Sequence, residues 1–276
     1  MRRLFLSPGN GPAGAPASLG GAKLAALARA GFFEEAREIE GLSTGANADP
    51  TSVEAMAVAD IYSGDMAAAC GKSRRITTGL DNAFWIRLRV ICYASSNELD
   101  AAELALGILR ENGRLNDADA ALLAPLAAGG KAKAPAAPLD AVQYAAAKAM
   151  GLPLDIGFLK QAEGGVVKAV ALDEGADWSV RIAAARRATA MGVMSGAQLK
   201  SLYGAAPAGA VGAYGAVKGM SAPELMRDRA GLIASELGSA GCFDELFAFS
   251  VLYADEIREV EGAILPASDA VRLGLS

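Results

Sequence analysis

Gly64-Asp65-Met66-Ala67-Ala68-Ala69 has one counterpart 33 residues earlier, Gly31-Phe32-Phe33-Glu34-Glu35-Ala36, and another 33 residues later, Asn97-Glu98-Leu99-Asp100-Ala101-Ala102. Each segment begins with a residue that favours turns, has a large apolar residue two positions later and alanine five positions later. A fixed period of this size is typical of stacked helix–turn–helix units, none of which can bury its apolar face alone. The interval therefore predicts an α-solenoid, in which helical hairpins stack along the chain.

The composition favours helices over strands. The chain has 276 residues, of which 53% are hydrophobic but only 6% are aromatic, so its apolar side chains are mostly those of Ala, Leu and Val. Alanine has the best helix propensity because it loses no side-chain entropy on folding. Runs that alternate apolar and polar residues, as half-buried strands do, are nearly absent. We therefore predict an all-α protein.

The 33-residue register covers only part of the chain. Three repeats are expected over residues 21–113, after an irregular lead-in at 1–20. Their helix pairs are Ala22–Ala30 with Phe33–Gly41, Val53–Tyr62 with Met66–Ile76, and Ala83–Ser95 with Asp100–Asn112. A Pro/Ala/Gly-rich linker is predicted at 114–139, with a subdomain boundary near residue 130, because prolines and glycines at this density break helices. Residues 140–276 are expected to form an irregular helical array, a degenerate solenoid.

The third predicted repeat resembles the tetratricopeptide repeat family. The large and small positions of that family fall, within one residue, at Trp85, Leu88, Cys92 or Tyr93, Ala101 or Ala102, and Leu106. The segment Gly64 to Ala69 is similar to the turn and small-residue start of the family's second helix. The resemblance implies a concave surface formed by the first helix of each hairpin. In composition the chain also resembles alanine-rich repeat proteins of Gram-negative cell envelopes.

The residue types needed for most catalytic and cofactor sites are missing. There is no histidine, the commonest general base and metal ligand, and the three cysteines show no CxxC spacing, so no metal site is expected. Gly71-Lys72-Ser73 lacks the earlier glycine of a phosphate-binding loop and falls within a predicted helix. The glycines of Gly209 to Gly215 do not match the dinucleotide-binding spacing. We therefore expect no cofactor and no enzyme activity.

Two groups of carboxylates leave one enzymatic alternative open. Asp173, Glu174 and Asp177 form the first group, and the second follows at Asp255, Glu256, Glu259 and Glu261. A pair of carboxylates at a fixed distance can hydrolyse glycosides. The second group alternates with Arg258, however, as on a solvated helix face. An acidic-residue cell-wall glycan hydrolase on a helical platform therefore stays the alternative.

Charge and hydropathy restrict the partners. The net charge is −5, and the basic residues cluster only briefly, at Lys72 to Arg75 and at Arg181 to Arg187. Nucleic-acid binding is therefore not expected. No stretch approaches the roughly 20 apolar residues of a membrane span, and the apolar run near Met1 is shorter than that of a signal peptide.

Two of the cysteines are placed to form a disulfide. In the repeat register, Cys70 falls in the second helix of the middle repeat and Cys92 in the first helix of the next, which should pack against it. A bridge would close a loop of 22 residues and contribute about 3 kcal/mol to stability. The alternative is two buried thiols. A disulfide would indicate the periplasm or cell envelope, with a leader missing from the sequence, and free thiols would fit the cytoplasm.

These observations predict a non-enzymatic protein-binding or scaffolding module with a helical-repeat groove. The partner would be a helix or an extended peptide laid in that groove. The resemblance nominates five first-helix residues for the contact: Arg29, Glu54, Tyr62, Arg87 and Ser95. A purely structural segment of an envelope assembly is the remaining alternative.

Overall fold

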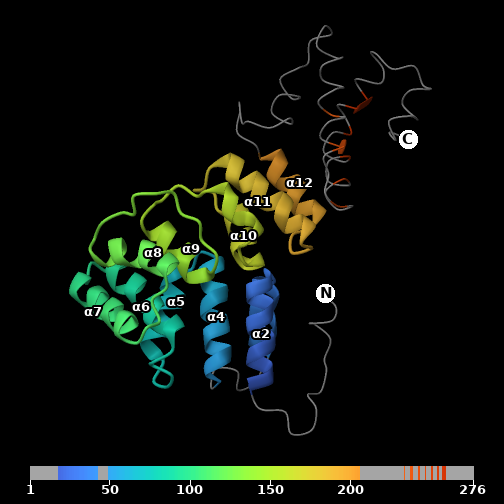
Figure 1. Ribbon diagram of the computed structural model, residues 1–276. Helices are drawn as coiled ribbons and strands as arrows, with labels where there is room; N and C mark the ends of the chain where they lie inside the picture. The colour runs from blue at the N-terminus through green and yellow to red at the C-terminus, as the bar shows by residue number, and fades with distance from the viewer. Residues whose placement is uncertain are drawn as a thin grey trace. The chain divides into compact units, whose positions relative to one another are not determined.

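Helices account for all regular secondary structure in the part of the chain that the structure describes. The structure is a computed structural model that describes residues 18–42 and 49–205, with a few single positions between 233 and 258. Within these residues it has eleven α-helices, one 3₁₀ helix and no strand, and only Ala136 and Leu154 form an isolated β-bridge. Figure 1 shows this arrangement. The prediction of an all-α protein is therefore confirmed for these residues.

The chain divides into two compact units, Met1–Val170 and Ala171–Ser276, and the division falls within α10. The helices of the chain up to that point are α2 (Ser18–Ala30), α3 (Phe33–Leu42), α4 (Pro50–Tyr62), α5 (Met66–Arg75), α6 (Ala83–Ser95), α7 (Leu99–Glu111), α8 (Asp117–Ala127), α9 (Ala141–Ala149), η2 (Ile156–Lys160) and α10 (Gly164–Leu172). The second unit contains α11 (Trp178–Ala190) and α12 (Gly196–Gly204).

The repeated turn residues close the first helix of each hairpin. Gly31 and Gly64 have φ angles of 104° and 80°, and Asn97 has 62°. This left-handed conformation costs least for glycine and is tolerated by asparagine. After each of these residues the next backbone N–H bonds a carbonyl five residues back, as from Asp65 to Asp60. The recurrence at 33 residues is thus a recurrence of one helix ending.

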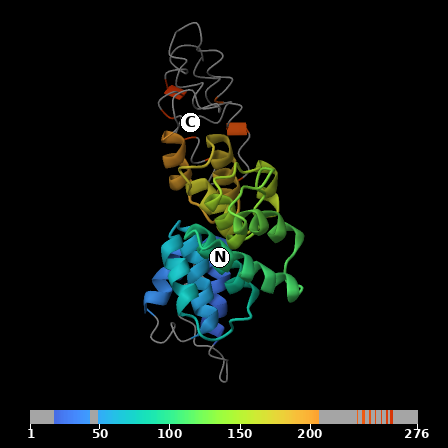
Figure 2. The same cartoon turned by 90° about the vertical axis from the view of Figure 1, so that its left-hand side faces the viewer.

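Successive hairpins pack side by side in the first unit. Helix α4 packs against α2, α3 and α5, and α6 packs against α5 and α7, as the blue to green helices of Figures 1 and 2 show. Large buried side chains fill the contacts, among them Phe33, Ile61, Trp85, Leu88 and Leu106. The disulfide between Cys70 and Cys92 joins α5 to α6, with the two Cα atoms 5.7 Å apart, which confirms the predicted pairing.

The register continues into residues for which the sequence predicts a linker. Asp49, Asn82 and Asn116 cap α4, α6 and α8, at intervals of 33 and 34 residues, so α8 begins where a fourth hairpin would begin. Pro125 lies in the last turn of α8, where the loss of one backbone hydrogen bond does not prevent the helix. Helix α9 then packs against the first helices α4, α6 and α8. Because of this packing, the first unit extends to residue 170 instead of ending near residue 130.

The second unit is described as far as residue 205. Asp177 caps α11, and Ser195 and Gln198 form a reciprocal capping box at the start of α12. The two helices pack together over small apolar side chains such as those of Ala184 and Ala188. Ser18 to Gly20, predicted as the end of an irregular lead-in, belong to α2, and residues 1–17 lie outside the described residues. Of the array predicted at 140–276, the part beyond residue 205 lies largely outside them.

No described helix combines the length and the apolar character that crossing a membrane requires.

Candidate functional site

Arg87 lies in a buried charged cluster on the side of α6 that α9 covers. Its guanidinium donates to Asp119 of α8 at 2.6 Å and to Asp140, the N-cap residue of α9, at 2.8 Å. The side chain is only 13% exposed and that of Asp119 only 2%. Gln143 of α9 also donates to Asp119, at 3.1 Å. Arg87 therefore binds the chain's own α8 and α9.

Tyr62 is buried under the segment that leads into α10. Its hydroxyl donates to Glu163 at 2.9 Å, and its ring packs against Phe33. Burial raises the pKa of Tyr62 well above its ordinary value of 10, and the neighbouring Glu163 carboxylate raises it further. Burial also raises the pKa of Glu163, although the hydrogen bond from Tyr62 opposes this effect. The phenol is therefore a neutral donor at physiological pH, held between two parts of the first unit.

Of the other three predicted contact residues, Arg29 lies close enough to Tyr62 and Glu163 for its charge to oppose the rise in their pKa values. Arg29 of α2 pairs with Glu54 of α4 at 3.3 Å, and Asn82 donates to the same carboxylate at 2.8 Å. Ser95 is exposed at the end of α6. The structure thus joins Arg29 to Glu54, buries Tyr62 and Arg87, and leaves Ser95 on its own.

We call the side of α4, α6 and α8 that carries Tyr62, Arg87 and Asp119 the inner face. Helix α9 packs on it with Ala141 to Ala147 buried. The start of α10 continues the cover, because Gly165 lies directly against the ring of Tyr62. Lys168 of α10 also reaches α3, where its buried ammonium lies 2.6 Å from Glu34 and 4.7 Å from the centre of the Phe33 ring. The groove expected on the first helices is therefore filled by the chain itself.

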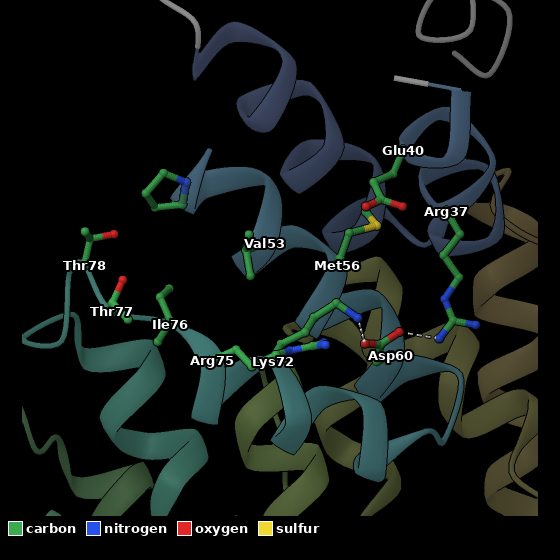
Figure 3. A pocket seen from close by; sticks show the side chains of 11 residues that line it. Arg37, Glu40, Val53, Met56, Asp60, Lys72, Arg75, Ile76, Thr77 and Thr78 are labelled. Carbon is green, nitrogen blue, oxygen red and sulfur yellow. Dashed lines mark hydrogen bonds and ion pairs between the residues drawn. The ribbon is translucent and has the colours of Figure 1, made fainter. Parts of the chain in front are cut away.

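A pocket of about 740 Å³ lies between α3, α4 and α5 (Figure 3). We call it the outer pocket. Asp60 and Tyr62 are two residues apart on α4, which turns them about 200° from each other around the helix axis. The outer pocket and the inner face therefore lie on different sides of α4. The residues that line the outer pocket are Arg37, Glu40, Pro50, Val53, Met56, Asp60, Lys72, Arg75, Ile76, Thr77 and Thr78.

Asp60 organises the charges at the base of the outer pocket. Its carboxylate is 7% exposed and is bound at 2.6 Å by Arg37 from α3 and at 2.6 Å by Lys72 from α5. Figure 3 shows these two cations reaching Asp60 from opposite sides. A buried carboxylate needs such partners, since an uncompensated charge would cost several kcal/mol. Asp60 thereby fixes α3 and α5 on either side of α4.

The rim of the outer pocket leaves polar groups available. Arg75, Glu40 and the hydroxyls of Thr77 and Thr78 have no hydrogen-bond or ion-pair partner among the residues that the structure describes. The side chains of Val53, Met56 and Ile76 supply apolar surface beside them. An aliphatic floor with a few polar groups at its edge suits the binding of side chains and backbone of a peptide.

One feature of the sequence indicates the charged contacts at the base of the outer pocket. Asp60 is the single charged residue in the apolar run from Ala55 to Tyr62. A charge inside a buried helical run requires partners from neighbouring helices. Arg37 and Lys72, however, are 23 and 12 residues away, and only the packing of the hairpins brings them together.

The first group of carboxylates does not form a paired site. Asp177 is fully exposed and caps α11, and its hydrogen bonds from Ser179 lower its pKa. Asp173 bonds the backbone of Gly175 in the preceding turn. The second group, Asp255 to Glu261, lies outside the described residues. No cluster of three or more His, Cys, Asp or Glu that could hold a metal occurs in the described ranges.

The fold and its pocket thus define an array of helical hairpins that is covered on the inner face and open at the outer pocket. No protein-family model, curated protein or solved structure matches the chain. The function is therefore inferred from the geometry of the chain's own residues.

Proposed function

We propose that the protein is a non-enzymatic protein-binding module built from tetratricopeptide-like hairpins, and that it takes a peptide segment in the outer pocket. The hairpin assignment is supported by the helix endings at Gly31, Gly64 and Asn97, which recur at 33 residues with the same backbone geometry. The continuation of the caps to Asn116 supports a fourth, incomplete unit.

One observation carries the choice of surface. The inner face, where the tetratricopeptide resemblance implies binding, is occupied by α9, whereas the outer pocket has about 740 Å³ and an arginine, Arg75, without a partner among the described residues. Of the five residues predicted to contact a partner, Tyr62 and Arg87 already bind Glu163, Asp119 and Asp140. The surface proposed for the partner is therefore formed by α3, α4 and α5.

The cysteines support a proposal for the compartment. A disulfide between Cys70 and Cys92 is stable in an oxidising environment such as the periplasm and is rare in the cytoplasm. We therefore propose that the module acts in the cell envelope. A scaffolding role there would use the same pocket to hold a neighbouring protein.

A glycan hydrolase is the second candidate, and the described residues favour it less. A general acid needs a carboxyl whose pKa is raised by burial, and Asp177 has the opposite environment. Neither it nor Asp173 lines the outer pocket. A purely structural segment would need no open pocket with unpartnered polar groups.

Selection of phage-displayed random linear peptides on the full chain tests the proposal. We expect families of related peptides whose binding is weakened at least about tenfold by Thr77→Trp, which places an indole at the exposed rim of the outer pocket. Ser201→Trp, at an exposed position of α12 in the second unit, is the matched control and should leave binding unchanged. Recovery of no peptide family, or of families indifferent to Thr77→Trp, would contradict the proposal.

A further inference from the structure

A second pocket borders α5 on its other flank. It has a volume of about 370 Å³ and lies between α5, α6 and the start of α7. Its lining residues are Ser73, Arg74, Arg89, Cys92, Tyr93, Ser96 and Glu98. Lys72 and Arg74, on the two pockets, are about 200° apart around α5. The last turn of α5 therefore separates the outer pocket from the second pocket, and the disulfide to Cys92 holds it in place.

The two pockets together are locally basic. Five cationic side chains line them, Arg37, Lys72, Arg74, Arg75 and Arg89, against the three carboxylates of Glu40, Asp60 and Glu98. The whole chain has the opposite balance, with a net charge of −5. The excess of cations is therefore a local feature of these two pockets.

The cations differ in whether they are already paired. Arg37 and Lys72 bind Asp60, whereas Arg74 and Arg75, both exposed, have no partner among the described residues. Arg89 uses one nitrogen on the backbone carbonyl of Ser73, at 3.2 Å. The hydroxyl of Ser73 is buried and also has no partner in the described part of the chain. Buried polar groups are normally bonded, so the unused donor of this hydroxyl beside the second pocket is unusual.

We propose that the partner is an acidic peptide segment that crosses the last turn of α5 and enters both pockets. This inference rests on the proposed function and names the chemistry of the partner. Carboxylates of the segment pair with Arg74 and Arg75 at the crest of the turn, and an aliphatic side chain packs on Val53, Met56 and Ile76 in the outer pocket. A helix is about 10–12 Å wide and an extended chain advances about 3.3 Å per residue, so three or four residues are enough to cross.

A nucleic acid fits the same surface less well. Asp60, Glu40 and Glu98 line the two pockets and would repel a continuous run of phosphates. Tyr93 is the single aromatic residue among the lining residues, whereas single-stranded nucleic acids are bound by several stacking platforms. A peptide can place its carboxylates over the arginines alone.

Charge reversal on the full chain tests the inference. Peptides from the selection described above are measured by fluorescence anisotropy against Arg74→Glu/Arg75→Glu and against the control Arg110→Glu/Arg187→Glu. The control changes the net charge equally, and its arginines also lie in the last turns of helices, α7 and α11. We expect the selected peptides to be enriched in Asp and Glu, and the first double variant to weaken their binding at least about tenfold. The control should change it less than about twofold.

The possible outcomes separate the two proposals. Peptides that respond to Thr77→Trp but carry no excess of acidic residues and ignore Arg74→Glu/Arg75→Glu would overturn the acidic partner and leave the peptide-binding function standing. A fluorescein-labelled oligothymidylate that binds as tightly as the peptides, with the same loss in the double variant, would overturn the peptide partner in favour of nucleic acid. If the charge-reversed chain does not fold, as judged by circular dichroism, Arg74→Gln/Arg75→Gln gives the same comparison with a smaller loss expected.

Discussion

At the scale of single residues, Arg87 of α6 joins three elements of the first unit, because it pairs with Asp119 of α8 and with Asp140 at the start of α9. It neutralises two carboxylates, Asp119 and Asp140, that belong to helices packed on either side of it. Removing one partner of a buried ion pair leaves a charge uncompensated, which typically costs about 3–5 kcal/mol. We therefore expect this guanidinium to contribute strongly to holding α9 on the inner face, beside the packing of Ala141 to Ala147.

We predict that Arg87→Met lowers the free energy of unfolding by about 3–5 kcal/mol. Arg87→Met combined with Asp119→Asn should lose less than the sum of the two single changes, because the second change removes the charge that the first leaves unpaired. Urea denaturation, monitored through the fluorescence of Trp85, measures these unfolding free energies. A Trp178→Phe background removes the tryptophan of the second unit, so that the signal comes from the first unit alone. Additive losses would contradict the buried pairing.

Glu163 gives stability a specific pH dependence. Burial raises the pKa of this carboxyl above its ordinary value of 4.5, so the folded protein holds the proton more tightly than the unfolded chain does. The contribution of Glu163 to stability is therefore fully present below pH 4.5. It declines as pH rises towards the higher pKa of the folded state, and above that pKa it stays constant.

We predict that Glu163→Gln removes this decline. The difference in unfolding free energy between the variant and the natural chain should grow with pH from 4.5 upward and then level off. The amide still offers an oxygen to the Tyr62 hydroxyl, so the hydrogen bond is retained. A difference that stays the same across this pH range would contradict the raised pKa of Glu163.

At the scale of elements, the close approach of α10 to α4 restricts one position to glycine. A Cβ atom added at Gly165 would collide with the ring of Tyr62, which is buried and hydrogen-bonded and has no room to turn away. Gly107 in the interior of α7 has nothing within 4 Å of the same added atom. Packing therefore requires glycine at position 165 but leaves room for a larger side chain at position 107.

We predict opposite effects of alanine at these two positions. Gly165→Ala should destabilise the first unit by about 1–3 kcal/mol through overpacking. Gly107→Ala should stabilise it by about 0.5–1 kcal/mol, because alanine loses less backbone entropy in a helix. Thermal unfolding of the two variants side by side measures the difference, and equal shifts would contradict the packing of α10 on Tyr62.

The disulfide between α5 and α6 is a second contact at this scale. Replacing Cys70 and Cys92 with alanine should lower the free energy of unfolding by about 3 kcal/mol, since the bridge closes a loop of 22 residues. Cys242→Ser serves as the control and should leave stability unchanged. A double variant as stable as the natural chain would show that the bridge does not restrict the unfolded chain.

The helices were predictable where a local signal repeats. Gly31, Gly64 and Asn97 adopt the same helix ending, so the sequence alone places three hairpins. Helix α8 was missed because Pro125 and Gly129–Gly130 outweighed the cap at Asn116, which continues the register. The position of α9 depends on Asp140 meeting Arg87 across 53 residues, a contact that no local pattern contains.

The candidate site was less predictable than the fold. Arg87 and Tyr62 are on the first helices, as expected, but their partners Asp140 and Glu163 come from segments outside the three repeats. The outer pocket lies where Asp60 of α4 binds Arg37 of α3 and Lys72 of α5. The distance between α3 and α5, the second helices of two successive hairpins, depends on how the hairpins pack. No spacing of residues along the sequence predicts that distance.

At the scale of the whole molecule, the three cysteines give a direct count. With Cys70 and Cys92 bridged, Cys242 is the free cysteine of the chain. We predict that alkylation under denaturing, non-reducing conditions labels one thiol per chain, and that prior reduction raises the number to three. Mass spectrometry of protein isolated from its native compartment measures this. Three labels without reduction would contradict the proposed envelope location.

Helix α9 also has a mechanical consequence. Open helical solenoids behave as soft springs, because each hairpin contacts only its neighbours and can be pulled away from them one at a time. Here α9 touches α4, α6 and α8 at once. The ion pair between Arg87 and Asp140 ties it to α6, and the hydrogen bond from Gln143 to Asp119 ties it to α8. Stretching the stack therefore requires breaking all these contacts together. We therefore expect the helices of the first unit to resist tension together and to separate in a single cooperative unfolding event.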